Sequence, residues 1–392
     1  MKKNKAINPL PFYAYLWPVV ALTVVGLADS TYLAISHYRQ YTDISYKSFC
    51  AISRAFNCDT VSQSPYAIFF NLPVAVWGVI GYALILMLLP YSGSKENGNV
   101  RIWPLLFWLS LAFSCGSINL ALISSFRIRS YCIMCIITYG VNFALVFYAW
   151  LIRRRFSNAG LIEDTKGDFL FLWRKQAKSV PLIAILLAIF LTTVVFIWSF
   201  FPAYWYFKPP HLSVNIPHGF TADGHPWIGA ENPMLEIIEF TDYQCFQCKK
   251  MHFFLRQFIA QNPTKIRLIH RHYPMDQKFN PIVKEPFHVG AGKMALLAIA
   301  SGSKNKFWEM NDLLYSIEEN KKVLSIKELS EALGLDQNEI ARAINSREIR
   351  YQLYRDIRAG NEMAITGTPA YIVDGKQYLG QLPAEILKKI ME

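Results

Sequence analysis

Six of the seven cysteines in this 392-residue sequence form three closely spaced pairs that are suited to redox chemistry. The pairs are Cys50/Cys58, Cys132/Cys135 and Cys245/Cys248. The second and third have the C-x-x-C spacing typical of thiol–disulfide exchange, in which a thiolate attacks a disulfide and a second thiol resolves the product. A static disulfide framework and half of a metal site are the alternatives that the spacing leaves open.

Five apolar stretches of membrane length lie in the first half of the chain. They are residues 12–36, 67–90, 102–126, 132–152 and 181–205. Because the first stretch is long and four more follow it, we interpret it as a retained helix and not as a cleaved signal peptide. The rest of the chain has the mixed charge of a water-soluble domain.

Most of the net charge of +12 resides in the membrane half. Residues 1–205 contain 17 Lys/Arg and 7 Asp/Glu, whereas the remaining residues contain 23 and 21. Basic residues gather before the first stretch and between the fourth and fifth, which the positive-inside rule assigns to the cytoplasm. We therefore expect no nucleic-acid partner, and we expect loop 38–66, turn 127–131 and the C-terminal domain on the outer side.

This topology places all three cysteine pairs in one compartment that permits disulfides. We call them by their expected positions: the loop pair is Cys50/Cys58, the membrane pair is Cys132/Cys135, and the outer pair is Cys245/Cys248. The seventh cysteine, Cys115, falls in the middle of a predicted span and is interpreted as a small core residue.

The stretch "MLEIIEFTDYQCFQCKKMHFFLRQFI" predicts a buried strand, a C-x-x-C and an amphipathic helix. This order places Cys245 at a helix N-terminus, where unpaired N–H groups stabilise a thiolate, and makes Cys248 the shielded resolving thiol. The elements expected after it are a strand at 265–274, a helical region at 284–360, a turn, strand and hairpin in "ITGTPAYIVDGKQYLGQLP", and a helix at 383–391.

Over about 225–392 the chain resembles the thioredoxin superfamily, and its DsbA-like periplasmic oxidoreductases in particular. The resemblance implies that Thr368 and Pro369 form the cis-proline loop facing the disulfide and that Glu239 is the buried acid that handles protons beneath it. Region 284–360 corresponds to the helical insertion of this branch. Phe-Gln stands where strongly oxidising members have Pro-His, which leaves the oxidising strength open. A trans Thr-Pro turn and a Glu239–lysine pair are the alternatives.

One face of the fourth predicted span carries Cys132, Cys135, Tyr139 and Asn142. Polar groups at this depth are unfavourable toward lipid, so we expect the face to point into the bundle. No haem, flavin or metal ligand set is visible, and the acceptor that fits a dithiol in hydrocarbon is a quinone. Tyr139 is expected to contact it. Asn142 is either a further contact or, as we favour, a tie between helices.

The loop pair lies in a polar segment from which it can meet both other pairs. After it, "CDTVSQSPYAIFFNLPVAVWGVIGY" changes from polar to aromatic before the second span begins. Tyr66, Phe69 and Phe70 are expected to form a short lid over the quinone site. Anchoring at the membrane interface is the alternative.

The membrane half resembles the vitamin K epoxide reductase (VKOR) family in its prokaryotic form, fused to a thioredoxin-like domain. The resemblance rests on the loop pair and on "LADSTYLAISHY", "NCDTVSQSPYAIFFNLP" and "YCIMCIITYGVN". It implies a four-helix bundle around a quinone, the membrane pair as redox centre, the loop pair as shuttle and Tyr139 as a quinone contact. Asp29, ionisable within the membrane, is a functional candidate or a bundle-internal hydrogen-bond partner. Ser64 is a further supporting candidate.

We therefore expect a membrane all-α four-helix bundle of the VKOR type with a fifth, tethering transmembrane helix, followed by a soluble α/β thioredoxin-like domain with a DsbA-like helical insertion. Residues 1–160 form the expected quinone-reducing membrane domain. Residues 161–210 form a cytoplasmic loop, the fifth transmembrane helix and a linker. Residues 211–392 form the periplasmic domain.

These features predict a multi-pass enzyme of the bacterial inner membrane, with a cytoplasmic N-terminus, that forms disulfides in exported proteins. Electrons pass from substrate thiols through the outer pair, the loop pair and the membrane pair to ubiquinone or menaquinone, with no metal. Two alternatives stay open. One is a reductase or isomerase that runs the relay in reverse, and the other is a non-enzymatic, tethered metal- or peptide-binding protein with structural disulfides.

Overall fold

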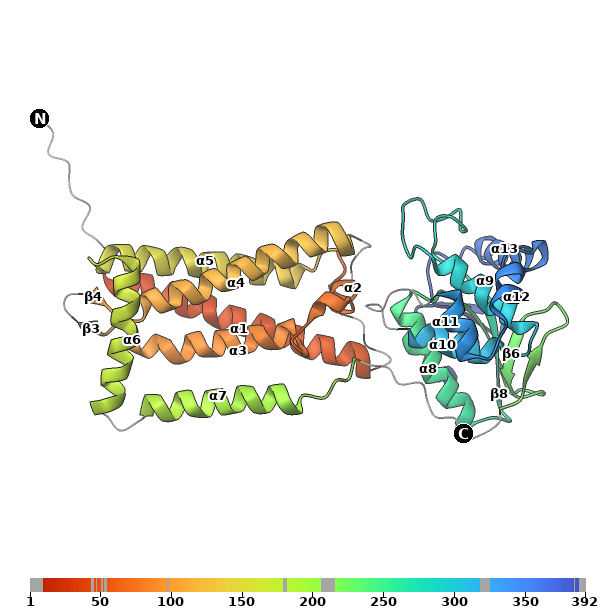
Figure 1. Cartoon of the computed structure of the whole chain (residues 1–392), viewed down its shortest axis with the longest axis horizontal. Coiled ribbons are helices and arrows are strands. Elements are labelled where there is room, and N and C mark those ends of the chain that lie inside the picture. Colours follow the sequence, from red (N-terminus) through yellow and green to blue (C-terminus); the bar gives the residue numbers. More distant parts are fainter. Residues whose placement is uncertain are drawn as a thin grey trace, which may run out of the picture. The chain divides into compact units, whose positions relative to one another are not determined.

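The chain folds into two compact units, Met1–Tyr204 and Trp205–Glu392 (Figure 1). The computed structural model describes residues 10–43, 46, 48–50, 52, 55–96, 99–178, 182–205, 216–317, 325–383 and 385–387. The first unit is built of long apolar helices and the second of a sheet with helices packed on it, which is the change that the hydropathy along the chain predicts.

Among the described residues, four helices are long and apolar enough to cross a membrane. They are α1 (Phe12–Thr42), α3 (Val74–Leu88), α4 (Trp103–Ile123) and α5 (Ile133–Phe156), where a helical turn continues α3 to Tyr91 and another continues α4 to Ile128. Helix α1 packs on α3 and α5, and α5 packs on α4, which confirms the predicted four-helix bundle (Figure 1). The fifth predicted span coincides with helix α7 (Leu182–Phe200), and its role as a membrane tether stays a prediction.

Glycines allow the bundle helices to approach one another closely. A Cβ atom on Gly26 of α1 would lie 2.4 Å from the Tyr82 ring of α3, and one on Gly81 would lie 2.1 Å from the Phe113 ring of α4. Close approach of this kind stabilises membrane helices through van der Waals contact, because lipid provides no hydrophobic driving force between them.

The prediction that Cys115 is a core residue was wrong, because its side chain is exposed on α4. Ser114 and Ser117, on either side of it, are buried and occupy the positions that face the bundle. The polarity of these small residues, and not the apolar thiol, marks the packed face of this helix.

The other elements of the first unit are short or lie across the bundle. They are α2 (Cys58–Ser62), the hairpins β1 (Ile68–Phe69) with β2 (Leu72–Pro73) and β3 (Lys95–Glu96) with β4 (Asn99–Val100), single turns at Pro65–Ala67, Leu89–Tyr91 and Ser124–Ile128, and α6 (Leu161–Lys178). Helix α6 runs across one end of the bundle in Figure 1 and fills the segment expected as a cytoplasmic loop. Its helical structure was not predicted.

The second unit is a six-stranded sheet in the order β10-β9-β7-β8-β6-β5. Its strands are β5 (His218–Phe220), β6 (Pro226–Gly229), β7 (Leu235–Thr241), β8 (Ile266–His272), β9 (Ala370–Val373) and β10 (Lys376–Leu379). Strands β7 and β8 are parallel and are joined by α8 (Phe246–Gln261), while the other neighbours are antiparallel. The β7–α8–β8 crossover and the β9–β10 hairpin confirm the predicted thioredoxin-like order.

The single helical region expected at 284–360 is divided in the structure. It contains α9 (Ala291–Gly302), α10 (Phe307–Ser316), α11 (Ile326–Ala332), α12 (Gln337–Ala343) and α13 (Arg347–Glu362). The first of these helices begins only at Ala291, because His288 and Gly290 have positive φ angles of 37° and 102°, which a right-handed helix does not accommodate. Strands β5 and β6 were not predicted, and most of the helix expected at 383–391 lies outside the described residues.

Candidate active site

The outer pair sits where β7 ends and α8 begins. Cys245 is the N-cap of α8, and its Sγ accepts a hydrogen bond from the backbone N–H of Cys248 at 3.4 Å. The same sulfur lies 3.3 Å from the carbonyl oxygen of Thr368, and the Thr368–Pro369 peptide is cis. Pairing of β9 with β7 brings this loop beside the cysteines. The sequence candidates of the second unit thus lie together.

The two sulfurs of the outer pair have different environments. The hydrogen bond from Cys248 lowers the pKa of the Cys245 thiol, burial opposes this, and the nearby charge of His288 lowers the pKa again. Burial raises the pKa of Cys248 well above its usual range. Because the thiolate is the attacking species in thiol–disulfide exchange, this difference favours Cys245 for the role of nucleophile and Cys248 for that of the protonated, resolving thiol.

Glu239 lies on β7 and is fully buried, hydrogen-bonded to Nδ1 of His270 on β8 at 2.7 Å. Nε2 of His270 is in turn 3.3 Å from Nδ1 of His272. Burial raises the pKa of Glu239 to about 7 and lowers the pKa of His270 to about 3. The carboxyl therefore exchanges its proton near neutral pH while His270 stays neutral. Tyr371 lies opposite Glu239 in the sheet, within electrostatic range of both Glu239 and Cys248.

The membrane pair repeats the arrangement of the outer pair. Cys132 is the N-cap of α5, and its Sγ accepts a hydrogen bond from the backbone N–H of Cys135 at 3.2 Å. Cys132 is buried, and both thiols of this pair are free. At both C-x-x-C sites the first sulfur therefore stands at a helix N-terminus and accepts a backbone N–H, an arrangement that stabilises a thiolate.

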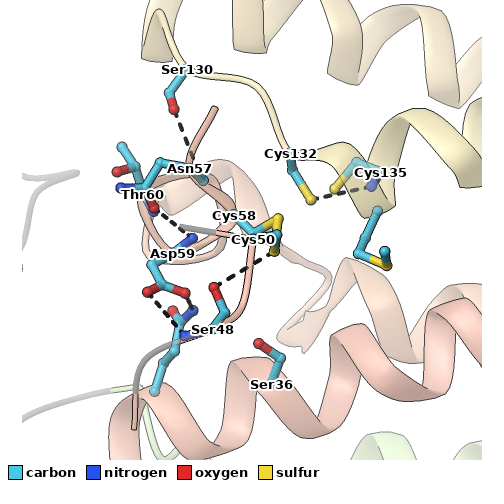
Figure 2. Close-up of a disulfide and its surroundings, with 12 residues drawn as sticks. Ser36, Ser48, Cys50, Asn57, Cys58, Asp59, Thr60, Ser130, Cys132 and Cys135 are labelled. Carbon is cyan, nitrogen blue, oxygen red and sulfur yellow. Dashed lines mark hydrogen bonds between the residues drawn. A yellow bond between two sulfur atoms is a disulfide. The ribbon is translucent and has the colours of Figure 1, made fainter. Parts of the chain in front are cut away.

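The loop pair is a disulfide packed against the membrane pair. Cys50 and Cys58 are bonded to each other and share one buried cluster with Cys132, as Figure 2 shows. The backbone fixes this contact, since Asn57 N donates to Tyr131 O at 2.9 Å and Tyr131 N donates to the carbonyl of Ala55 at 2.8 Å. The residues that precede Cys58 and Cys132 are therefore paired directly.

Helix α2 adds a second support to the loop disulfide. The side chain of Asn57 caps this helix by accepting hydrogen bonds from the N–H groups of Asp59 and Thr60 at 3.0 and 3.1 Å. The carboxylate of Asp59 accepts from Gln40 of α1 and from the N–H of Ser48. Asp59 and Ser48 lie near the loop disulfide in Figure 2. These contacts hold the segment on both sides of the disulfide against the bundle.

A cavity of about 330 Å³ opens beside the membrane pair. Its lining includes the loop-pair residue Cys58, both thiols of the membrane pair, and the sequence candidates Ser64, Tyr66, Phe69, Tyr139 and Asn142. Phe70 is not among the lining residues: its side chain is 70% exposed, and its carbonyl accepts from Trp198 Nε1 at 3.0 Å. Asp29 is not a lining residue either, but its carboxylate accepts a hydrogen bond from Thr138, which does line the cavity.

Asn142 joins three helices at the cavity wall. Its side-chain oxygen accepts from the Tyr82 hydroxyl at 2.7 Å, and its side-chain nitrogen donates to Ser117 Oγ at 2.9 Å. This is the geometry of the helix tie that the sequence favoured. Because the amide is occupied on both sides, Tyr139 is the better placed of the two for contact with a bound molecule.

The cavity fits a quinone headgroup in size and chemistry. Its volume is within the range of small-molecule sites, and its walls are largely apolar and aromatic with a few polar groups. Both thiols of the membrane pair lie at its wall, as does Tyr139, whose hydroxyl is a hydrogen-bond donor of the kind that a carbonyl oxygen accepts. In the part of the chain that the structure describes, no group of three or more His, Cys, Asp or Glu side chains is placed to hold a metal ion.

Sequence reasoning missed the histidines around the outer pair. His270 and His272 alternate along β8 and therefore point to the same face of the sheet, which "HRH" in a predicted strand indicates. His288 had no local signal, because only the tertiary fold brings its loop to Cys245.

Comparison with known proteins agrees with this division. Residues 17–150 match the vitamin K epoxide reductase family, and residues 221–392 match the thioredoxin family. The chain is 28% identical over 144 residues to vitamin K epoxide reductase complex subunit 1 of Mus musculus, a match that covers 33% of this chain and 86% of the mouse protein.

A Na⁺/H⁺ antiporter NhaA 3 from Salinispora tropica is 24% identical over 159 residues, which is 41% of this chain. The match spans only 23% of the antiporter's length. Among solved structures, the thiol-disulfide exchange protein alpha-DsbA2 from Wolbachia pipientis is similar, with 23% identity, coverage of 43% of this chain and 86% of that chain, and a TM-score of 0.36. The chain therefore combines a VKOR family domain at residues 17–150 with a thioredoxin-like domain at residues 221–392.

Proposed function

We propose that this membrane disulfide oxidoreductase is a dithiol oxidase, which carries electrons from the thiols of exported proteins to a membrane quinone. The observation that carries the proposal is the packing of the Cys50–Cys58 disulfide against Cys132 beside the cavity. A purely structural disulfide has no need of a free dithiol in the same buried cluster.

The first exchange takes place at the outer pair. A substrate thiolate attacks Cys245 of the oxidised pair, and Cys248 leaves and takes up a proton, for which the donor in this proposal is Glu239, the buried acid of β7 whose pKa is raised to about 7. A second substrate thiol attacks the mixed disulfide, which releases an oxidised substrate and leaves the outer pair reduced. The cis-proline loop at Thr368 and Pro369 offers backbone to the substrate during this step.

The second and third exchanges pass the electrons inward. The reduced outer pair opens the loop disulfide, entering at Cys58, and the reduced loop pair then opens an oxidised membrane pair through Cys50 and Cys132. Each exchange forms one disulfide and breaks one, so two electrons move at every step without an outside reductant. A quinone held in the cavity beside Cys132, Cys135 and Tyr139 would supply the final oxidation, since it can accept two electrons and two protons.

The residues around the cavity have distinct parts in this proposal. Tyr139 orients the acceptor by hydrogen bonding, and Tyr66 and Phe69 close the outer wall against water. Cys50 and Cys58 are only 1% and 3% exposed, so exchange with the outer pair requires local opening of the loop. Phe70 lies outside the lining and has no part in the closed site.

The proposed orientation places the N-terminus in the cytoplasm and all three cysteine pairs on the outer side of a bacterial inner membrane. The fifth helix, α7, then returns the chain to the outer side before the thioredoxin-like domain. The acceptor class is a respiratory quinone, ubiquinone or menaquinone, and the partners are exported proteins with reduced cysteines.

The test is quinone reduction in proteoliposomes supplied with a reduced client peptide. The unmodified protein should reduce quinone, and a serine at any of the six paired cysteines should abolish this. Cys115→Ser is the matched control and should retain full activity, since this cysteine is outside all three pairs. Quinone reduction that survives the loss of any one pair would contradict the relay. Direction is read from Cys245 in cells: mostly oxidised supports an oxidase, and mostly reduced supports the reverse reaction.

A further inference from the structure

The dipeptide between the outer-pair cysteines, Phe246–Gln247, carries no charge that could stabilise a thiolate. The loop before α9 brings a histidine to this place from elsewhere in the chain. Gln244, the residue before Cys245, donates its side-chain N–H to the carbonyl of Val289 at 2.8 Å. Val289 directly follows His288, so this hydrogen bond holds the loop that carries the histidine against the residue next to Cys245.

A carboxylate holds His288 in this position. Nδ1 of His288 lies 3.0 Å from Oδ2 of Asp242, which is buried. The backbone carbonyl of Asp242 accepts from the N–H of Cys245 at 3.1 Å. Asp242 therefore touches both the histidine and the residue that carries the reactive sulfur.

The loop around His288 is fixed on its other side as well. The Phe287 ring stacks on His288 with centroids 4.0 Å apart, and Asp276 accepts from the N–H of Gly290 at 2.9 Å. The side chain of His288 remains 19% exposed, so solvent reaches the ring. A partly exposed imidazole held in this way can carry a positive charge at a fixed place near the start of α8.

We propose that His288 is the residue that stabilises the Cys245 thiolate by its positive charge, and that Asp242 positions it and offsets part of that charge. The electrostatics agree in sign, since His288 lowers the pKa of Cys245 and Asp242 raises it. The other titratable groups that face this sulfur are Cys248 from α8 and Tyr371 from β9. This inference rests on the proposed exchange role of the outer pair.

With this charge nearby, the disulfide of the outer pair is a stronger oxidant than it would be with the uncharged Phe246–Gln247 dipeptide alone. Stabilising the thiolate stabilises the reduced form, so the disulfide accepts electrons more readily. Removing the charge should raise the Cys245 pKa and shift the exchange equilibrium with glutathione toward the disulfide about tenfold, which corresponds to about 30 mV for two electrons.

The experiment uses the full chain in detergent with the other five cysteines replaced by serine, so that only the outer pair reacts. Alkylation of Cys245 against pH gives its pKa, and equilibration with glutathione gives the exchange constant. His288→Gln should raise the pKa and shift the equilibrium, His288→Lys should restore both, and the exposed His218→Gln is the control and should match the parent.

A Cys245 pKa that is unchanged in His288→Gln, or raised equally by Gln and Lys, overturns the inference. Should His288→Gln fail to fold, His288→Asn decides, because it removes the same charge with a shorter side chain, and a Cys245 pKa that is unchanged in this variant overturns the inference. A parent that folds but does not react with glutathione would contradict the proposed function itself, which separates the two failures.

Discussion

Replacing Glu239 by glutamine should stabilise the second unit at alkaline pH and leave it nearly unchanged in acid. Glutamine keeps the shape of the side chain and the hydrogen bond to His270, but it cannot ionise. Burial raises the pKa of Glu239 from 4.5 to about 7, so the folded protein holds this proton where the unfolded chain has lost it.

The magnitude follows from linkage between protonation and folding. An acid with a raised pKa contributes fully below pH 4.5, and its contribution falls as pH rises through 7, because the unfolded state then binds fewer protons. A shift from 4.5 to about 7 is worth about 3 kcal/mol, of which about 2 kcal/mol is lost between pH 5 and pH 8. His270 titrates in both proteins and cancels in the comparison.

Urea denaturation of the full chain measures this difference when unfolding of the second unit is detected by its cleavage by a protease. The free energy of unfolding of Glu239→Gln minus that of the parent should be about 2 kcal/mol larger at pH 8 than at pH 5. Glu236→Gln is the control, because this neighbour on β7 is 45% exposed and pairs with Arg267 at the surface. An equal difference at both pH values would refute the buried-acid reasoning.

Three further changes test other parts of the structure. Tyr82→Phe removes the hydrogen bond to Asn142 and leaves a buried acceptor unpaired, which should destabilise the bundle by about 1–3 kcal/mol. Thermal unfolding in detergent measures this loss, and an unchanged midpoint would disprove the helix tie. Asn57→Ala removes the N-cap of α2 and should cost about 1 kcal/mol, exposing the loop disulfide to faster reduction by a mild dithiol, whereas an unchanged reduction rate would mean that the cap does not hold it. Cys248→Ser should accumulate mixed disulfides between Cys245 and exported proteins on non-reducing gels; their absence from a folded protein would argue against the role of the outer pair.

Local patterns predicted most of the positions in the site. The apolar lengths predicted the four bundle helices, and a strand, a C-x-x-C and an amphipathic helix in succession predicted Cys245 at a helix N-terminus. The resemblance to thioredoxins implied the cis peptide at Pro369. These features depend on neighbouring residues or on short motifs, which a single sequence contains.

The contacts that join distant segments could not be predicted. The loop disulfide is held against Cys132 by backbone pairing of Asn57 with Tyr131, and no local pattern encodes that pairing. His288 lies against Asp242, close to the outer pair, only because its loop interrupts the helical region that the composition predicts. Cys115 shows the opposite error, because mean hydropathy identifies a span but not the side of it that faces the bundle.

The most direct test of the relay is to trap the exchange between the loop pair and the membrane pair. With Cys135→Ser, no resolving thiol remains at that site, and Cys132 should be recovered from membranes in a disulfide with a loop cysteine, Cys50, by peptide mapping. If Cys132 is instead a free thiol while Cys50 and Cys58 stay bonded to each other, the electrons do not take this path and the account is contradicted.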